Sequence, residues 1–528
     1  MRTIAVLLFG AMTLADSGPA GATWYRASSE HFLIYSEQKP QALREFAEDL
    51  EKFDGAVRAL RGMNDLPLSQ GNRITIFTLR NAADVQRLYG DKNGFIQGFY
   101  KGRATGSVAY VARGDRPNGQ RHRAGADITW ESLTSGVDGE TILLHEYAHH
   151  LMMQDLDVPY PEWLVEGFAE FMSTTQFERD GTVGIGLPAA HRYYGLLNGK
   201  MLPLEMLLSG KYETVTEEEH ESIYGRGWLL THYLTFEPSR KGQLSSYLAT
   251  LSKGVDPLQA ARDSFGDLKK LERDLGSYLH RTKLQYLKVS GSALNFTPIQ
   301  IAPISPGGEA VVPLLAEIKN GLSANAAESV AQKVRDVQRL YTGDGLVETT
   351  LAEAELDGDH FDAAEGAADR AIKINSRDTE AMVLKGRAIL ERAAQTTDDA
   401  KGRSLFEQAR NIFIATNRID PEDPEPLADY YEAYVREGRR PTDNAIAALH
   451  YASDLAPQDL GLRMNSALAY LAENKAPDAR HALIPIAYDP HGGSIAKIAR
   501  SMIERIDAGD VKGALSAPSQ ATAKGGNH

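Results

Sequence analysis

The sequence has no cysteine among its 528 residues. This absence excludes disulfide bonds, thiolate metal ligands and cysteine nucleophiles, and it leaves histidine and carboxylate side chains as ligands for any metal ion. An excess of positive charge is also lacking, because 71 Asp and Glu residues outnumber 57 Lys and Arg residues and the net charge is −14. We therefore expect neither a nucleic-acid partner nor an anionic membrane surface.

Long hydrophobic runs are missing as well. The apolar segment Thr3–Ala15 is shorter than the roughly 20 residues that a membrane-spanning helix needs, although a membrane anchor is the alternative interpretation. Arg2 precedes it and the small residues Ala20-Gly21-Ala22 follow it, an arrangement typical of a secretory signal peptide. We predict a signal peptide at residues 1–22, cleavage near Ala22, a periplasmic or secreted mature chain, and no stable transmembrane segment after cleavage.

The first half of the chain carries patterns of both strands and helices. Alternating apolar residues predict strands over His31–Ser36, Arg73–Leu79 and Gly106–Ala112, and helical spacing predicts a helix over Pro40–Arg61. A small mixed sheet is therefore expected before the longer helices. This length of chain also predicts two or three domains.

Two further helices are predicted after these strands. Asp138 is suited to be the N-cap of a helix that runs to about Asp155, and Pro161 stands at the start of a second helix that reaches about Phe177. Strands followed by helices predict an α+β domain, which we place at residues 23–290.

Beyond this domain the composition changes. Proline and glycine residues between 297 and 308 mark a linker at residues 291–310, and the pattern from 311 to 512 is almost wholly helical. The tail, residues 513–528, has little apolar side-chain mass and is predicted to be disordered.

Within residues 311–512, the segment Gly358–Ala364 with Ala371 resembles the second helix of a tetratricopeptide repeat (TPR). The helices are predicted to end at Asn375-Ser376, Asp420-Pro421, Ala456-Pro457 and Asp489-Pro490. The last two intervals, 36 and 33 residues, bracket the usual 34 of this repeat, whereas the first requires an insertion around Ala394–Ala400. We predict an all-α TPR-like domain that binds a protein partner; an irregular helical bundle is the alternative.

The segment His145-Glu146-Tyr147-Ala148-His149 has the H-E-x-x-H pattern. Residues i and i+4 share one face of a helix, so two imidazoles can bind one tetrahedral zinc ion while Glu146 flanks the open position. The neighbouring residues are apolar, which predicts a buried helix on which unpaired polar side chains would be costly. A polar turn of an amphipathic helix is the alternative.

The second predicted helix carries Glu166 and Glu170 one turn apart among large apolar residues. A catalytic zinc with two histidine ligands needs a third protein ligand, and Glu166 fits that place. Glu170 is then placed to orient a ligand histidine without binding the metal itself. Glu162 stands at the helix start and is interpreted as a partner of the helix dipole.

His145 to His149, followed 17 residues later by Glu166 in Trp-Leu-Val-Glu-Gly-Phe-Ala-Glu, resembles the gluzincin metallopeptidases related to aminopeptidase N. This resemblance implies a thermolysin-like zincin fold for the catalytic domain and one Zn2+ per chain on His145, His149 and Glu166. It also implies that Glu146 is the general base. The two motifs cover about residues 141–171 directly.

The same family carries a transition-state tyrosine in a Tyr-x-Lys-Gly-like segment some 60 residues after the ligand glutamate. Tyr224 begins Tyr-Gly-Arg-Gly 58 residues after Glu166, so the resemblance implies that it stabilises the oxyanion. A core tyrosine is the alternative. Arg226 could pair with a substrate carboxylate or with an acid such as Glu221, and His150, His191 and His220 are expected to be ordinary surface or core histidines.

One departure from the aminopeptidase N pattern concerns the substrate amine. Those exopeptidases place a Gly-x-Met-Glu-Asn segment on the strand before the zinc helix, whereas the comparable strand here reads Gly106-Ser-Val-Ala-Tyr-Val-Ala. We therefore expect a zinc endopeptidase that accepts an extended peptide or protein along that edge strand. A catalytically silent scaffold and a hydrolase of non-peptide amides are the alternatives.

Overall fold

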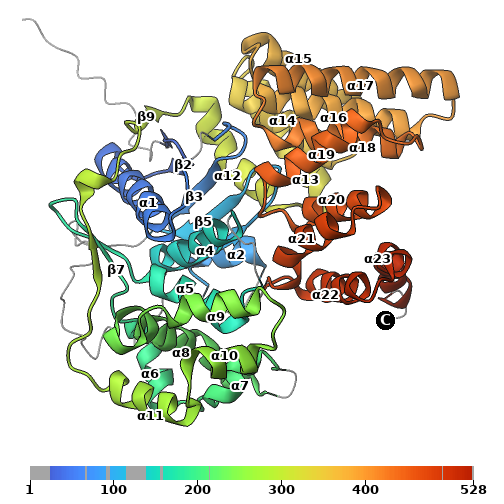
Figure 1. The fold of residues 1–528 in the computed structure, drawn as a ribbon. Coiled ribbons are helices and arrows are strands. Elements are labelled where there is room, and N and C mark those ends of the chain that lie inside the picture. Colours follow the sequence, from blue (N-terminus) through green and yellow to red (C-terminus); the bar gives the residue numbers. More distant parts are fainter. Residues whose placement is uncertain are drawn as a thin grey trace, which may run out of the picture.

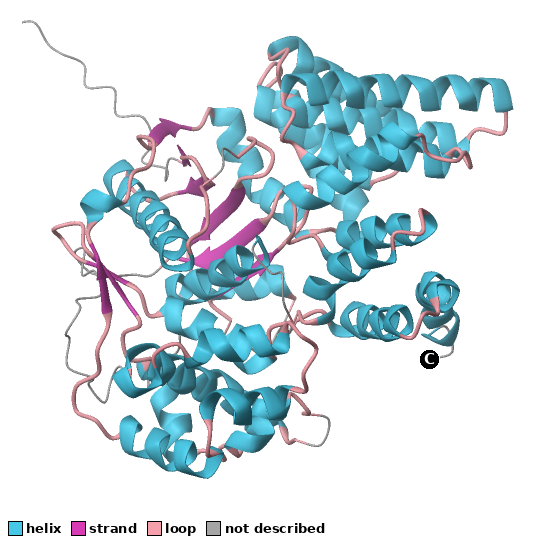
Figure 2. Cartoon of the chain, viewed as in Figure 1, coloured by secondary structure: helices cyan, strands magenta, loops and turns pink. Residues whose placement is uncertain are grey.

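The computed structural model of the chain describes residues 24–65, 68–90, 96–113, 138–154, 159–212, 215–489 and 491–525. Within these ranges the chain is mostly helical, with a six-stranded mixed sheet and a smaller three-stranded sheet. Figure 1 shows the arrangement, and Figure 2 shows how few strands there are beside the helices. No helix in the described ranges is long and apolar enough to cross a membrane. The predicted signal peptide lies outside these residues.

The six-stranded sheet has the order β4-β5-β3-β2-β1-β9. Its strands are β1 (Tyr25–Ser28), β2 (Phe32–Ser36), β3 (Ile74–Leu79), β4 (Gly98–Lys101), β5 (Val108–Ala112) and β9 (Gln300–Pro303). The three central strands β2, β3 and β5 are parallel, and β1, β4 and β9 add antiparallel pairs at the two sides. The three strands expected from alternation are therefore confirmed as β2, β3 and β5.

Each face of this sheet is covered by helices. Ile34, Ile76 and Val111 point to one face and share a core with α1 (Pro40–Arg61) and α4 (Gly139–Gln154). The alternate residues Tyr35, Phe77 and Tyr110 stack in a row on the other face, with ring centroids 5.3 and 5.5 Å apart. That face is covered by α12 (Pro306–Asn320), and the Tyr110 hydroxyl donates a hydrogen bond of 2.9 Å to the carbonyl of Ala316.

The segment 291–310, predicted to be a linker, is instead part of this sheet. It contains β9, which pairs antiparallel with β1 along its whole length. Pro303 is tolerated because β9 is an edge strand, where one side needs no backbone donor. The proline and glycine content that suggested a linker therefore marks an edge strand and the first turn of α12.

A layer of helices lies beside the sheet, in the lower part of Figure 1. These helices are α5 (Glu162–Ser173), α6 (Ala190–Asn198), α7 (Leu204–Ser209), α8 (Glu217–Phe236), α9 (Gln243–Leu251), α10 (Pro257–Phe265) and α11 (Leu268–Leu279); α2 (Ala82–Tyr89) lies at the sheet. The second sheet is formed by β6 (Gln176–Phe177), β7 (Val183–Ile185) and β8 (Leu287–Val289). Short 3-10 turns occupy Pro238–Arg240 and Gly291–Ala293.

The helix α5 ends at Ser173, four residues before the predicted end at Phe177. The hydroxyls of Ser173 and Thr175 donate to the carbonyls of Glu170 and Met172, at 3.0 and 2.7 Å. Such local bonds compete with helical ones and end the helix.

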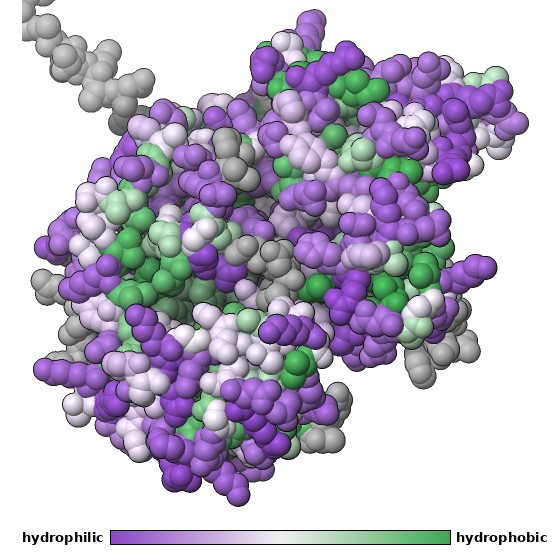
Figure 3. Space-filling model, viewed as in Figure 1, coloured by the Kyte–Doolittle hydropathy of each residue, from purple (hydrophilic) through white to green (hydrophobic). Residues whose placement is uncertain are grey.

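The C-terminal half is a row of helices: α13 (Ala324–Leu340), α14 (Gly345–Asp357), α15 (Phe361–Ile374), α16 (Thr379–Gln395), α17 (Asp399–Ile419), α18 (Pro424–Arg436), α19 (Asp443–Leu455), α20 (Leu460–Ala472), α21 (Ala476–Ala487), α22 (Gly493–Asp507) and α23 (Val511–Gly525). Each packs against the next in the sequence, and α14, α16 and α18 also pack on one another. This is the contact pattern of a helical repeat array. In Figure 3 the surface of this half is largely hydrophilic, while apolar residues gather in a hollow on the sheet-containing half.

The predicted helix ends are confirmed, because α15, α17, α19 and α21 each end one or two residues before the expected stop. The predicted insertion lengthens α16 and α17. The predicted disordered tail is wrong for residues 513–525, which belong to α23. Alanine favours helix, and Ala514 and Ala517 are buried against the preceding helices.

Candidate metal centre

The helix α4 places two histidines on one face. Asp138 caps its start, as predicted, by accepting a 2.8 Å hydrogen bond from the backbone N–H of Thr141. Leu144 and Leu151 anchor the helix in the core, and His145 and His149 are both buried one turn apart. Their rings meet edge to face with centroids 4.7 Å apart. The histidine pair is thus held on a rigid element.

Glu166 on α5 completes a triangle of ligand atoms. Nε2 of His145 lies 3.1 Å from Nε2 of His149, and Oε2 of Glu166 lies 3.3 and 3.5 Å from these two nitrogens. Ligand atoms placed tetrahedrally at zinc's usual bond lengths lie about 3.3 Å from one another. Both oxygens of Glu166 are buried without a hydrogen-bond partner among the described residues. The donor types and their spacing are compatible with a bound metal ion.

Glu170, one turn after Glu166 on α5, lies next to the imidazole ring of His145. Its Oε1 is 3.4 Å from Nδ1 of His145, on the ring edge opposite the metal-facing nitrogen. His191 and Arg192 on α6 hold the same carboxylate at 2.8 and 2.5 Å. The structure therefore brings Glu170 close to His145 and to two further residues that the sequence did not indicate.

His145, Glu166 and Glu170 each shift the pKa values of their neighbours toward the charged form. Burial would lower the pKa of His145, but Glu166 and Glu170 raise it to about 10. Burial would likewise raise the pKa of Glu166, but His149 and His145 hold it well below its ordinary value. For Glu170 the effect of burial is outweighed by Arg192 and His145, which keep its pKa far below normal. Both carboxylates are therefore ionised and suited to a cation.

Tyr224 lies on α8, and its ring is close to that of His145. The helix begins with a capping box of Thr216 and Glu219, and its backbone approaches α5 closely at Gly227. The ring centroid of Tyr224 lies 6.2 Å from that of His145, and the guanidinium of Arg192 lies 4.8 Å from the Tyr224 ring. Burial and the nearby Glu166 charge raise the pKa of Tyr224, so its hydroxyl stays protonated and is able to donate.

Glu146 is half-buried beside the two histidines. Burial and the negative charge of Glu146 raise the pKa of Tyr100, which lies on β4 and whose hydroxyl is 2.7 Å from Nδ1 of His150. The charge of Glu146 therefore lies near Tyr100 on β4. The expectation that Gly106–Ala112 forms this edge is wrong, because β5 pairs with β3 on one side and β4 on the other. The short β4 was not recognised in the sequence.

Arg226 and Glu162 pair with residues other than His145, His149, Glu166 and Glu170. Arg226 is buried, donates to the carbonyl of Leu202 and pairs with Glu272 at 2.6 Å, so its acidic partner is Glu272 and not Glu221. Glu162 lies in the first turn of α5, as expected for a dipole partner, and is 3.1 Å from His220.

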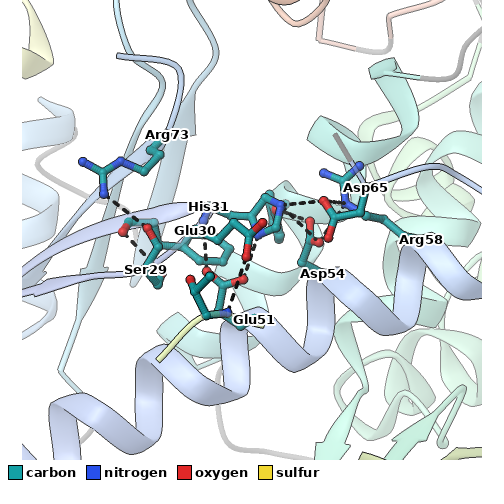
Figure 4. A network of polar contacts seen from close by, with 11 residues as sticks. Ser29, Glu30, His31, Glu51, Asp54, Arg58, Asp65 and Arg73 are labelled. Carbon is teal, nitrogen blue, oxygen red and sulfur yellow. Dashed lines mark hydrogen bonds and ion pairs between the residues drawn. The ribbon is translucent and has the colours of Figure 1, made fainter. Parts of the chain in front are cut away.

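A second polar cluster lies behind α4 and is shown in Figure 4. His31 is 2.7 Å from Glu51 through Nδ1 and 3.1 Å from Asp65 through Nε2. Although His31, Asp54 and Asp65 lie close enough to bind a metal, Arg58 already pairs with Asp54 at 2.7 Å. The cluster is thus an ion-pair network. It helps to hold α4 in place, because the hydroxyl of Tyr147 on α4 donates a 2.6 Å hydrogen bond to Asp54.

A cavity of about 660 Å³ lies between the far face of the sheet and the helical half. It is lined by residues of both signs, including Arg26, Arg73, Lys319, Glu380 and Glu425. No residue of the metal cluster lines it, so the cavity and the metal cluster are separate features.

Comparison with known proteins leaves the function to be argued from these residues. No family model matches the chain, and no curated protein matches it. Among solved structures, the chain is similar to a thermophilic TPR protein of Thermus thermophilus, with 17% identity and a TM-score of 0.30, over 34% of this chain and 90% of that one.

Proposed function

We propose that the chain is an exported zinc-dependent endopeptidase of the gluzincin type, with a zincin catalytic domain and TPR-like repeats that recruit a protein partner or substrate. The observation that supports it most is the triangle of His145, His149 and Glu166 with ligand atoms 3.1–3.5 Å apart. Glu146 and Tyr224 flank this triangle. Two imidazole nitrogens and one carboxylate oxygen are a donor set typical of a catalytic zinc site.

When bound, zinc would polarise the scissile carbonyl and lower the pKa of a water molecule. Glu146 takes the proton from that water as it attacks, and then gives the proton to the leaving amine. The Tyr224 hydroxyl donates to the carbonyl oxygen as negative charge develops there. Glu170 holds the ring of His145 in the orientation that binding requires.

The position of β4 favours an extended peptide as substrate. Its outer edge is unpaired among the described strands, and it carries Tyr100 next to Glu146 and His150. A peptide could add to this edge through backbone hydrogen bonds, which gives binding without a requirement for a free terminus. Among the described residues of β4 and β5 there is no carboxylate that would capture an amine, which supports endopeptidase activity.

The test is metal analysis and peptide-library digestion with the full chain and with Glu146→Gln. We expect one zinc per wild-type chain and chelator-sensitive cleavage within peptides. Glu146→Gln should keep the zinc and lose roughly 10²–10⁴-fold of the rate, since it loses a general base. Glu140→Gln, in the first turn of the same helix, is the matched control. Absence of bound zinc, or full activity of Glu146→Gln, would reject the proposal.

The same digestion separates the alternatives. Zinc-loaded protein that cleaves no peptide would indicate a zincin-like scaffold that acts through its repeats. Cleavage of cell-wall fragments without cleavage of peptides would indicate a hydrolase of non-peptide amides.

A further inference from the structure

A histidine of the helical half lies at the metal centre. His491 stands between α21 and α22, and its Nε2 is 3.4 Å from Oε1 of Glu166. Its ring meets that of His149 edge to face, with centroids 5.5 Å apart. The His491 side chain is 54% exposed, whereas Glu166 is 1% exposed, so His491 lies between Glu166 and solvent. In Figure 1 the start of α22 accordingly reaches toward α4 and α5.

The two oxygens of Glu166 face different partners. Oε2 faces the two histidines of α4, whereas Oε1 faces His491. A carboxylate that binds a metal through one oxygen is usually held through the other by a hydrogen-bond donor. The 3.4 Å separation becomes a hydrogen bond after a shift of a few tenths of an ångström, because such bonds span about 2.7–3.2 Å.

The fold of the helical half fixes this position. The backbone N–H of His491 donates to Oδ1 of Asp489 at 2.7 Å, and the N–H of Gly492 donates to the Asp489 carbonyl at 3.2 Å. Arg500 on α22 donates to the carbonyl of Ala487 at 2.5 Å, which ties the two helices together. Both helices pack in one apolar core with α20 and α23. The position of His491 next to Glu166 therefore depends on where the last repeat helices lie.

We propose that His491 is a positioning residue through which the C-terminal repeats complete the metal centre: it holds Oε1 of Glu166 so that Oε2 faces the metal. The inference rests on the proposed metal function.

The experiment compares zinc affinity, by competition with a chromophoric chelator, in the full-length wild type, His491→Ala, His491→Gln and Lys497→Ala. Lys497 is exposed on α22 and serves as the control. We expect His491→Ala to weaken zinc binding about tenfold, the lower end of the effect of such outer-shell changes, and His491→Gln to restore most of it because its amide donates. The visible spectrum of the Co2+-loaded protein should change in His491→Ala and not in Lys497→Ala.

Equal zinc affinity and an identical Co2+ spectrum in the wild type and His491→Ala would overturn the inference and leave the proposed function standing. A wild type that binds no zinc would overturn both. A His491→Gln variant as weak as His491→Ala would also count against the inference, because loss of a donor is then not the cause.

Discussion

The backbone of Gly167 on α5 lies directly against that of Gly227 on α8. A Cβ on Gly167 would lie 2.3 Å from the carbonyl carbon of Gly227, and one on Gly227 would lie 2.4 Å from the carbonyl oxygen of Trp163. Backbone atoms cannot rotate away from such a contact. Because Glu166 precedes one glycine and Tyr224 lies one turn before the other, this close approach brings the ligand and the phenol to the same place.

Gly167→Ala and Gly227→Ala should each destabilise the protein, because the added methyl group forces two helices apart. We expect a loss of about 1–3 kcal/mol in the free energy of unfolding, measured by urea denaturation. Gly276→Ala is the control, since Gly276 is exposed on α11 and a Cβ there meets nothing within 4 Å. That variant should gain about 0.5–1 kcal/mol. Equal effects at all three positions would contradict the close-contact explanation.

Tyr224→Phe should keep the fold and the bound metal but lose roughly 100-fold in kcat with little change in KM, since a donor to the developing oxyanion acts only in the transition state. Steady-state kinetics on a cleaved peptide measures the effect. Tyr233→Phe is the control, because Tyr233 lies on the same helix but packs on Tyr278, with ring centroids 4.9 Å apart. Unchanged kcat in Tyr224→Phe would leave Tyr224 a packing residue.

Glu170→Gln should weaken zinc binding about 10–100-fold, because a neutral amide holds Nδ1–H of His145 less firmly than a carboxylate. The same change removes the partner of His191 and Arg192. A chelator competition titration measures the affinity. Glu221→Gln provides the control, since Glu221 is largely exposed and approaches only the outer side of Arg192 at 3.9 Å. If both variants bind zinc like the wild type, Glu170 does not orient the ligand.

The network around His31 predicts a pH dependence of stability. Burial would lower the pKa of His31, but Glu51 and Asp54 raise it from 6.5 to about 9. Since the folded-state pKa is above the unfolded one, protonated His31 contributes its full stabilisation below about pH 6.5 and loses it as the pH rises through about 9. The free energy of unfolding should fall over this window by at most about 3 kcal/mol.

Urea denaturation at several pH values between about 6 and 9 checks this slope. His31→Gln should flatten it, because the titrating group is gone. His280→Gln should keep the wild-type slope, since His280 is exposed at the end of α11. A slope that persists in His31→Gln would assign the dependence to another group.

Sequence patterns were sufficient to group the candidate residues of α4 and α5. The i, i+4 spacing of His145 and His149 and the carboxylates of α5 imply a shared site, because helical periodicity fixes which side chains meet. The same periodicity predicted the helix Pro40–Arg61, whereas Asn-Ser and X-Pro stops predicted the ends of the repeat helices. These features depend on local geometry, which the sequence encodes directly.

The residues that the sequence did not indicate contact the candidate site only through the tertiary fold. His191 and Arg192 follow no motif and matter only because α6 packs beside α8. His491 lies in another half of the chain, and its pairing with Glu166 depends on how the repeats are placed against α5. The short strands β4 and β9 carry too few residues for a period to be recognised.

The pairing of β9 with β1 has a consequence for how the chain can be divided. The six-stranded sheet receives its last strand only after the helices α4 to α11 have been made, and α12 then covers the aromatic row on its far face. A fragment that ends at residue 290 would leave β1 as an open edge and Tyr35, Phe77 and Tyr110 exposed to water, which favours aggregation. The unit that contains the sheet therefore extends through Asn320.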